Sequence, residues 1–186
     1  VAVRTGNVSA GTSIFSMVVL ENPLKNIHEE IDIVTTPDGK PVAMVHCNNC
    51  TNDSNAWISV LKETAELFGT EPKTEDLYTK LYEISLEADD DCGGIFVCNY
   101  MSGEGITKFD SGVPFVVRKP DCRFTLPNFM RATLYSTMAT LKTGLNILAD
   151  EKVKIQHVPK NNGILLTGVC IIKKGGRITP TIYLED

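Results

Sequence analysis

The feature that most constrains this chain is a helical repeat of apolar side chains in its second half. Six of them follow one another at intervals of four, four, three, four and three residues: Met130, Leu134, Met138, Leu141, Leu145 and Leu148. This spacing matches the period of an α-helix, and Pro127 suits the first turn of such a helix. The sequence therefore predicts a long amphipathic helix whose apolar stripe packs against another layer of the fold.

Short apolar runs elsewhere predict the strands of that other layer. We expect strands at residues 1–3, 14–20, 31–35, 42–46, 93–100, 113–118, 153–158 and 163–172. The turn residues Pro37-Asp38-Gly39 make 31–35 and 42–46 a predicted hairpin. Further helices are expected after Asp53 or Ser54, and from Thr74 to the acidic run at 89–91. Strands followed by helices, and then strand, helix and strand, predict a single α/β layered domain.

Composition and charge exclude several classes of function. Hydrophobic residues make up 42% of the chain and charged residues 22%, which is typical of a globular protein. The formal net charge is −5 and no basic stripe is present, so we expect no nucleic-acid partner. No apolar run approaches the ~20 residues of a membrane span, and no signal segment opens the chain. We therefore expect a cytoplasmic protein with reduced cysteines and no membrane association.

Two segments have the residue types of a binding site. Gly11, Thr12 and Ser13 lie between two strand-like runs, and a turn of small residues can offer main-chain N–H groups and hydroxyls to a phosphate. An ordinary hairpin turn would have the same composition. Ser102, Gly103 and Glu104 follow the predicted strand 93–100, and loops at strand ends often form sites. A solvated surface loop is the alternative there.

Two other clusters are weaker candidates. Cys47 and Cys50 form a C-x-x-C pair, which occurs in zinc and redox sites, but a structural zinc ion needs four ligands. Small thiols packed at a strand end explain the pair more simply. The acidic run at 89–91 is expected to be a solvated helix end, although carboxylate clusters can bind Ca²⁺ or Mg²⁺. No metal site is therefore predicted.

Three segments in order resemble the FGGY family of carbohydrate kinases, particularly its xylulose and ribulose kinase branch. Residues 6–13 (GNVSAGTS) are similar to the phosphate-binding G-T-S hairpin of that family. Residues 99–104 (NYMSGE) resemble its P-Y-x-S-G-E-R loop, with Asn99 in place of proline and Gly105 in place of arginine. Residues 128–134 (NFMRATL) resemble its signature helix, with Tyr135 where an acidic or amide residue is common. The resemblance covers residues 1–167 and leaves 168–186 unmatched.

The resemblance implies a fold, a reaction and partners. The fold would be the ribonuclease H-like α/β fold of the actin and hexokinase superfamily, with a mixed sheet flanked by helices. The whole of 1–186 would be the C-terminal, nucleotide-binding domain, truncated at its C-terminus and separated from an N-terminal domain that holds the sugar. The γ-phosphoryl group of ATP would pass to a hydroxyl of a ketose such as xylulose or ribulose, with Mg²⁺ offsetting the phosphate charge. The catalytic aspartate would lie upstream of Val1, so no residue here is assigned that role.

The same resemblance assigns residues to the nucleotide. Gly11, Thr12 and Ser13 would bind the phosphates, and Ser102, Gly103 and Glu104 would line the cleft between the domains. The adenosine motif, G-H-G-G-x-x-K-T in the family, aligns with residues 160–167, where Asn162, Gly163 and Thr167 would lie beside the adenosine. We expect the isolated chain to be inactive and prone to form a homo-oligomer. A non-catalytic remnant or interaction module that keeps the fold is the alternative.

Overall fold

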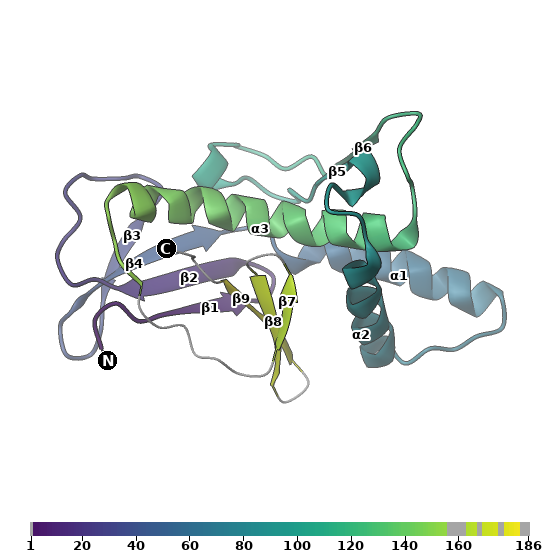
Figure 1. The fold of residues 1–186 in the computed structure, drawn as a ribbon, viewed down its shortest axis with the longest axis horizontal. Helices are drawn as coiled ribbons and strands as arrows, with labels where there is room; N and C mark the ends of the chain where they lie inside the picture. The colour runs from purple at the N-terminus through teal and green to yellow at the C-terminus, as the bar shows by residue number, and fades with distance from the viewer. Residues whose placement is uncertain (1, 156–162, 167–168, 175–176, 183–186) are drawn as a thin grey trace.

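The computed structural model describes residues 2–155, 163–166, 169–174 and 177–182 of the chain. The first half contains strands β1 (Gly6–Ala10), β2 (Ile14–Val19), β3 (Asp32–Thr35) and β4 (Pro41–Cys47), followed by helices α1 (Thr51–Leu67) and α2 (Thr74–Ile84). Strands β5 (Ile95–Cys98) and β6 (Phe115–Arg118) then precede the long helix α3 (Leu126–Asp150). Strands β7 (Gly163–Leu166), β8 (Val169–Lys174) and β9 (Arg177–Ile182) form a separate sheet. The predicted α/β fold of strands flanked by helices is confirmed (Figure 1).

The main sheet has the strand order β1-β2-β4-β3, and its neighbouring strands are antiparallel. Short connections explain this direction, because parallel neighbours need a crossover of a dozen or more residues. Ala10 pairs with Ile14 across the turn between β1 and β2, and Thr35 pairs with Pro41 across the predicted Pro37–Gly39 turn. The resemblance implied a mixed sheet, whereas the described strands of this sheet pair only in the antiparallel sense.

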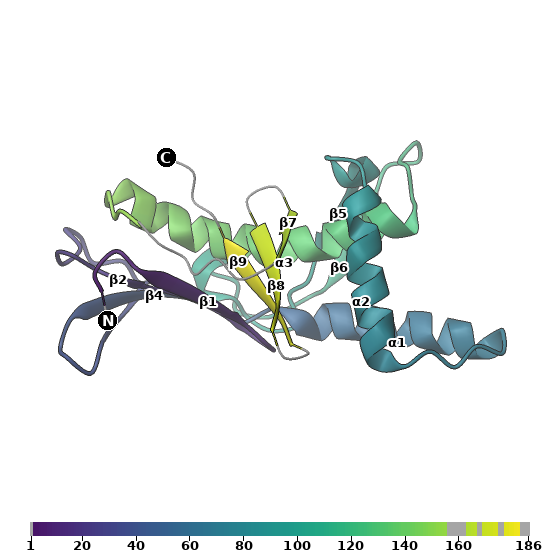
Figure 2. The same ribbon diagram turned by 60° about the horizontal axis from the view of Figure 1, so that its bottom comes forward.

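Helix α3 spans two hydrophobic cores. Its C-terminal half packs on the main sheet, with Leu141, Leu145 and Leu148 in one core together with Ile14 and Val45. Its N-terminal half packs on α1, α2 and β5 in a second core (Figure 2). Gly144 permits the close approach to the sheet, because a Cβ at this position would overlap the Val45 side chain. The helix predicted from periodicity is therefore confirmed, and it joins the two halves of the molecule.

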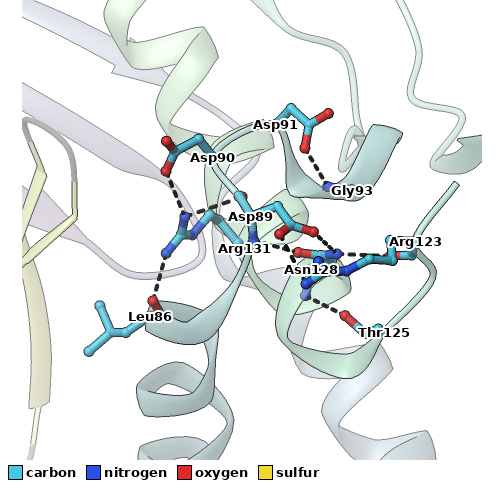
Figure 3. A network of polar contacts seen from close by, with 9 residues as sticks. All are labelled: Leu86, Asp89, Asp90, Asp91, Gly93, Arg123, Thr125, Asn128 and Arg131. Atoms are coloured by element: carbon cyan, nitrogen blue, oxygen red, sulfur yellow. Dashed lines mark hydrogen bonds and ion pairs between the residues drawn. The ribbon is translucent and has the colours of Figure 1, made fainter.

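A polar network fastens the N-terminal half of α3 to the segment that follows α2 (Figure 3). The buried Arg131 guanidinium donates to three main-chain carbonyls, those of Ser85 at 2.9 Å, Leu86 at 3.0 Å and Asp89 at 3.2 Å. The fully buried Asn128 accepts from the Asp89 N–H and donates to the Asp89 carboxylate, and Arg123 pairs with the same carboxylate at 2.9 Å. The first aspartate of the acidic run therefore has a structural role.

Several predicted boundaries were wrong. A strand was predicted at residues 1–3, but residues 2–5 include no extended strand, and the first strand is β1 at Gly6–Ala10. These residues are extended because each pairs with one residue of β2, which is a non-local effect. Residues 153–155 are not a strand, and 156–158 lie outside the described part of the chain. Within the part of the chain that the structure describes, none of the helices combines the length and the apolar character of a membrane span.

Candidate functional site

The Gly11–Ser13 turn joins β1 to β2 at one end of the main sheet. Gly11 and Thr12 are exposed and Ser13 is half-buried. The Gly11 N–H donates to the Ser13 carbonyl at 2.8 Å, so it is already used within the turn. Within the described residues, the N–H groups of Thr12 and Ser13 have no main-chain acceptor. The turn therefore offers two main-chain donors, and the Thr12 and Ser13 hydroxyls beside them, to an external acceptor.

The protein's own packing does not demand a glycine at position 11. A Cβ there would meet only the Ser13 carbonyl, at the ordinary contact distance of 3.9 Å. Gly6 lies in β1, five residues before Gly11, and a Cβ there would meet the Met17 carbonyl at 2.9 Å, so that glycine is required by the sheet itself. The open space above Gly11 leaves room for a group from outside to approach the backbone closely.

The turn also contacts the N-terminus of α1. The Cys50 N–H donates to the Thr12 carbonyl at 3.0 Å, and the Thr51 N–H and hydroxyl donate to the Gly11 carbonyl at 3.2 and 2.8 Å. These bonds satisfy donors that a helix start leaves free, and Cys50, the residue before α1, makes no side-chain cap. The turn is thus fixed by its carbonyls, while the Thr12 and Ser13 N–H groups have no main-chain acceptor among the described residues.

The Ser102–Glu104 loop contacts the same region from the other side. Ser102 is exposed, whereas Glu104 is only 1% exposed and lies inside the protein. One carboxylate oxygen, Oε2, accepts from the Asn48 N–H at 2.9 Å, the Asn49 N–H at 3.3 Å and the Asn49 side-chain amide at 3.1 Å. Gly103 lies so close to the following segment that a Cβ there would meet the Asp110 carbonyl at 2.6 Å.

The structure adds Asn48 and Asn49 to the candidate site, residues to which the sequence alone gave no role. They lie between the end of β4 and the start of α1, next to the residues that hold the Gly11–Ser13 turn. The junction formed by residues 48–51 therefore contacts both predicted segments. Two asparagines between a buried strand and a helix start were the available signal, because side-chain amides can satisfy free main-chain groups at such a boundary.

The remaining candidates have different outcomes. Cys47 and Cys50 are buried free thiols, and burial raises the pKa of both, that of Cys50 to about 12. Buried thiols held in the neutral form are what the packing interpretation predicts, since metal ligation and thiol exchange need the thiolate. The part of the chain that the structure describes contains no group of three or more possible metal ligands.

Of the three residues expected beside the adenosine, Gly163 begins β7, while Asn162 and Thr167 lie outside the described residues.

Comparisons with solved structures show the same fold in sugar kinases. The xylulose kinase from Bifidobacterium adolescentis superposes with a TM-score of 0.62 at 17% identity, covering 84% of this chain and 28% of the kinase. The gluconate kinase from Lactobacillus acidophilus gives 0.56 at 14% identity, with 82% and 29% covered. The Plasmodium falciparum glycerol kinase with ADP gives 0.59 at 10% identity, with 84% and 30% covered. The chain thus spans less than a third of the length of these kinases.

These likenesses confirm the expected fold class, an α/β fold that the chain shares with sugar kinases. A search of curated protein sequences finds no match to the chain. The sequence profile of the FGGY family of carbohydrate kinases, C-terminal domain, matches residues 6–164. That range includes the Gly11–Ser13 turn, the Ser102–Glu104 loop and the whole of α3. The chain therefore belongs to the FGGY family of carbohydrate kinases, as a C-terminal domain.

Proposed function

We propose that this chain is the nucleotide-binding part of an ATP-dependent kinase that phosphorylates a hydroxyl of a ketose such as xylulose or ribulose. Family membership supports a phosphotransfer role, and two of the structural neighbours described as xylulose kinases favour a ketose. The sugar and the catalytic aspartate would be held by an N-terminal domain outside this chain. By itself the chain would therefore bind nucleotide without transferring phosphate, in the cytoplasm.

The observation that carries the proposal is the Gly11–Ser13 turn. Its Thr12 and Ser13 N–H groups have no main-chain acceptor among the described residues, both residues also have hydroxyls, and the space at Gly11 is open. Main-chain N–H groups at a tight turn are well suited to phosphate oxygens, because they are fixed donors that need no reorganisation on binding. The three carbonyl contacts to Cys50 and Thr51 hold the turn in this arrangement.

The chemistry would follow from these positions. ATP supplies the transferable phosphoryl group, and Mg²⁺ neutralises charge on its phosphates. Mg²⁺ commonly binds through substrate phosphates and few protein ligands. Thr12 and Ser13 would orient the phosphates through their N–H and hydroxyl groups. Asn162, Gly163 and Thr167 would lie on the adenosine side, and the Ser102–Glu104 loop at the domain interface.

Self-association is a further part of the proposal. The two-stranded β5–β6 sheet exposes large apolar side chains, with Phe96 61%, Val117 54% and Phe115 46% exposed. Apolar patches of this kind often mark contact surfaces. Sedimentation velocity should show a species larger than a monomer, and a monomer at high concentration would refute this part alone.

Titration calorimetry with MgATP on two glycine variants tests the nucleotide proposal. Gly11→Ala should leave the unfolding temperature close to that of the wild type and weaken MgATP binding by about tenfold or more, since the added methyl group fills the phosphate space. Gly6→Ala should lower the unfolding temperature through its clash with the Met17 carbonyl and leave the affinity of the folded fraction unchanged.

The opposite pattern, or no heat of binding to the wild-type chain at millimolar MgATP, would favour the alternative. That alternative is an interaction module that keeps the fold without nucleotide chemistry.

A further inference from the structure

The β4–α1 junction, residues 48–51, connects two segments that lie far apart in the sequence. Its second half holds the Gly11–Ser13 turn through the main-chain N–H groups of Cys50 and Thr51. Its first half holds the Ser102–Glu104 loop through Asn48 and Asn49. Since the four residues are consecutive, a displacement of one segment is transmitted over a few covalent bonds to the other.

The Asn49 side chain is the centre of the loop contact. It is 2% exposed, and its Oδ1 accepts from the Met101 N–H at 2.8 Å and the Ser102 N–H at 2.9 Å. Its Nδ2 donates to the Ser102 carbonyl at 3.2 Å and to Glu104 Oε2 at 3.1 Å. Both ends of the amide are therefore used, and the opposite orientation would set its NH₂ group against two N–H donors.

The environment of Glu104 makes the contact between Asn49 and the loop sensitive to the loss of a hydrogen bond. Three N–H donors converge on Oε2, whereas Oε1 is buried and has no hydrogen-bond partner in the described part of the protein. Burial of a charged group is costly unless hydrogen bonds compensate it. With one oxygen unpartnered, the carboxylate depends on the three donors at Oε2, and removal of the Asn49 donor would weaken the hold on the whole loop.

We infer that Asn49 is a positioning residue that couples the Gly11–Ser13 turn to the Ser102–Glu104 loop. The inference rests on the proposed function for the meaning of the turn as a phosphate site. Through this coupling, a phosphate bound at the turn steadies the loop, and a loop held in place keeps the turn ready for phosphate. Asn49 itself touches neither the nucleotide nor the reacting atoms.

Amide hydrogen exchange measured by NMR tests the coupling without any ligand. Asn49→Asp replaces the donating NH₂ with an oxygen that repels Glu104, so the exchange of the Gly11, Cys50 and Thr51 amides should accelerate by about tenfold, the effect of losing one charge-assisted hydrogen bond. The matched control is Asn52→Asp, which adds the same charge to an exposed position of α1 and should leave these amides unchanged.

A milder variant covers the case in which Asn49→Asp does not fold. Asn48→Ala removes only the exposed bond from Asn48 Nδ2 to the Gly103 carbonyl, and the turn amides should exchange about threefold faster. Gly105→Ala serves as a loop control, because its added Cβ meets nothing within 4 Å. Unchanged exchange at the turn in the folded variants would overturn the coupling.

The effect of MgATP on amide exchange gives a second test. If Asn49 had a purely structural role, its substitution would not change this effect. In the wild type, saturating MgATP should slow exchange of the Met101 and Ser102 amides, and Asn49→Asp should abolish this slowing while Asn52→Asp retains it. Slowing that persists in Asn49→Asp would overturn the inference. If the ligand-free coupling is found but the wild type binds no MgATP, the proposed function fails and the positioning role of Asn49 stands.

Discussion

Replacing Arg131 by methionine should destabilise the protein strongly without touching the candidate site. Arg131 is 6% exposed, and its guanidinium donates to the carbonyls of Ser85, Leu86 and Asp89 in the segment that follows α2 (Figure 3). Methionine keeps much of the apolar stem and removes all of these donors. The variant therefore isolates the polar fastening of α3 to the α2 region from the packing around it.

The magnitude follows from the three bonds and their surroundings. A hydrogen bond to a charged group contributes about 1.5–3 kcal/mol, and the desolvation of a buried charge offsets several kcal/mol of the sum. The Ser85 and Asp89 carbonyls each keep one main-chain donor, from Ala88 and Cys92, so they are not left unpaired. We expect a loss of about 3 kcal/mol in the free energy of unfolding. For a chain of this length, that corresponds to a fall of about 6–12 °C in the unfolding temperature.

Urea unfolding followed by the fluorescence of Trp57, the single tryptophan, measures this loss directly. Trp57 reports on the same region, because its ring packs against Phe129 of α3 with centroids 4.9 Å apart. The control is Arg123→Met, which removes an ion pair with Asp89 from a side chain that is 67% exposed and should cost under about 1 kcal/mol. If the two variants are equally stable, the carbonyl contacts of Arg131 do not hold α3 as described.

Three further predictions concern acid sensitivity, the loop and the thiols. Hydrogen bonds from His28 and Asn26 lower the pKa of Glu151 from 4.5 to about 2, so its contribution to stability is present above pH 4.5 and lost as the pH falls toward 2. The urea midpoint of Glu151→Gln should therefore fall less than that of the wild type between pH 5 and about pH 3, and equal falls would refute this. Gly103→Ala should cost about 2 kcal/mol in thermal unfolding because its Cβ meets the Asp110 carbonyl at 2.6 Å, and a neutral effect would contradict that geometry. Cys47 and Cys50 should react with a thiol reagent only on unfolding, since burial raises the pKa of both, and rapid labelling of the folded protein would count against it.

The helices could be predicted from sequence because their signals are local. Apolar periodicity located α3, and Pro127 lies in its first turn as expected. The structure adds Thr125 as the cap, its hydroxyl accepting from the Asn128 N–H. The position of β1 could not be predicted in this way. Gly6, Asn7 and Ser9 have weak strand preference, and the segment is extended because β2 pairs with it.

In the candidate site, too, local sequence patterns predict some features and not others. The small residues of the Gly11–Ser13 turn and the polar loop at Ser102–Glu104 are visible as local patterns. The contact of Asn49 with Glu104 joins residues 55 positions apart, and no local pattern predicts such a pair. The burial of Glu104 was likewise unforeseen, because a carboxylate in a glycine-containing loop ordinarily faces solvent.

The proposed function depends on binding of nucleotide phosphates by the Thr12 and Ser13 main-chain N–H groups. A titration of the isotope-labelled chain with MgATP, followed by the shifts of its backbone amide signals, measures this binding at the two residues themselves. We expect the largest shifts at Thr12 and Ser13, and much smaller shifts there with AMP, which lacks the terminal phosphates. Unmoved Thr12 and Ser13 signals at saturating MgATP, or equal shifts with AMP, would show that these N–H groups do not bind the phosphates.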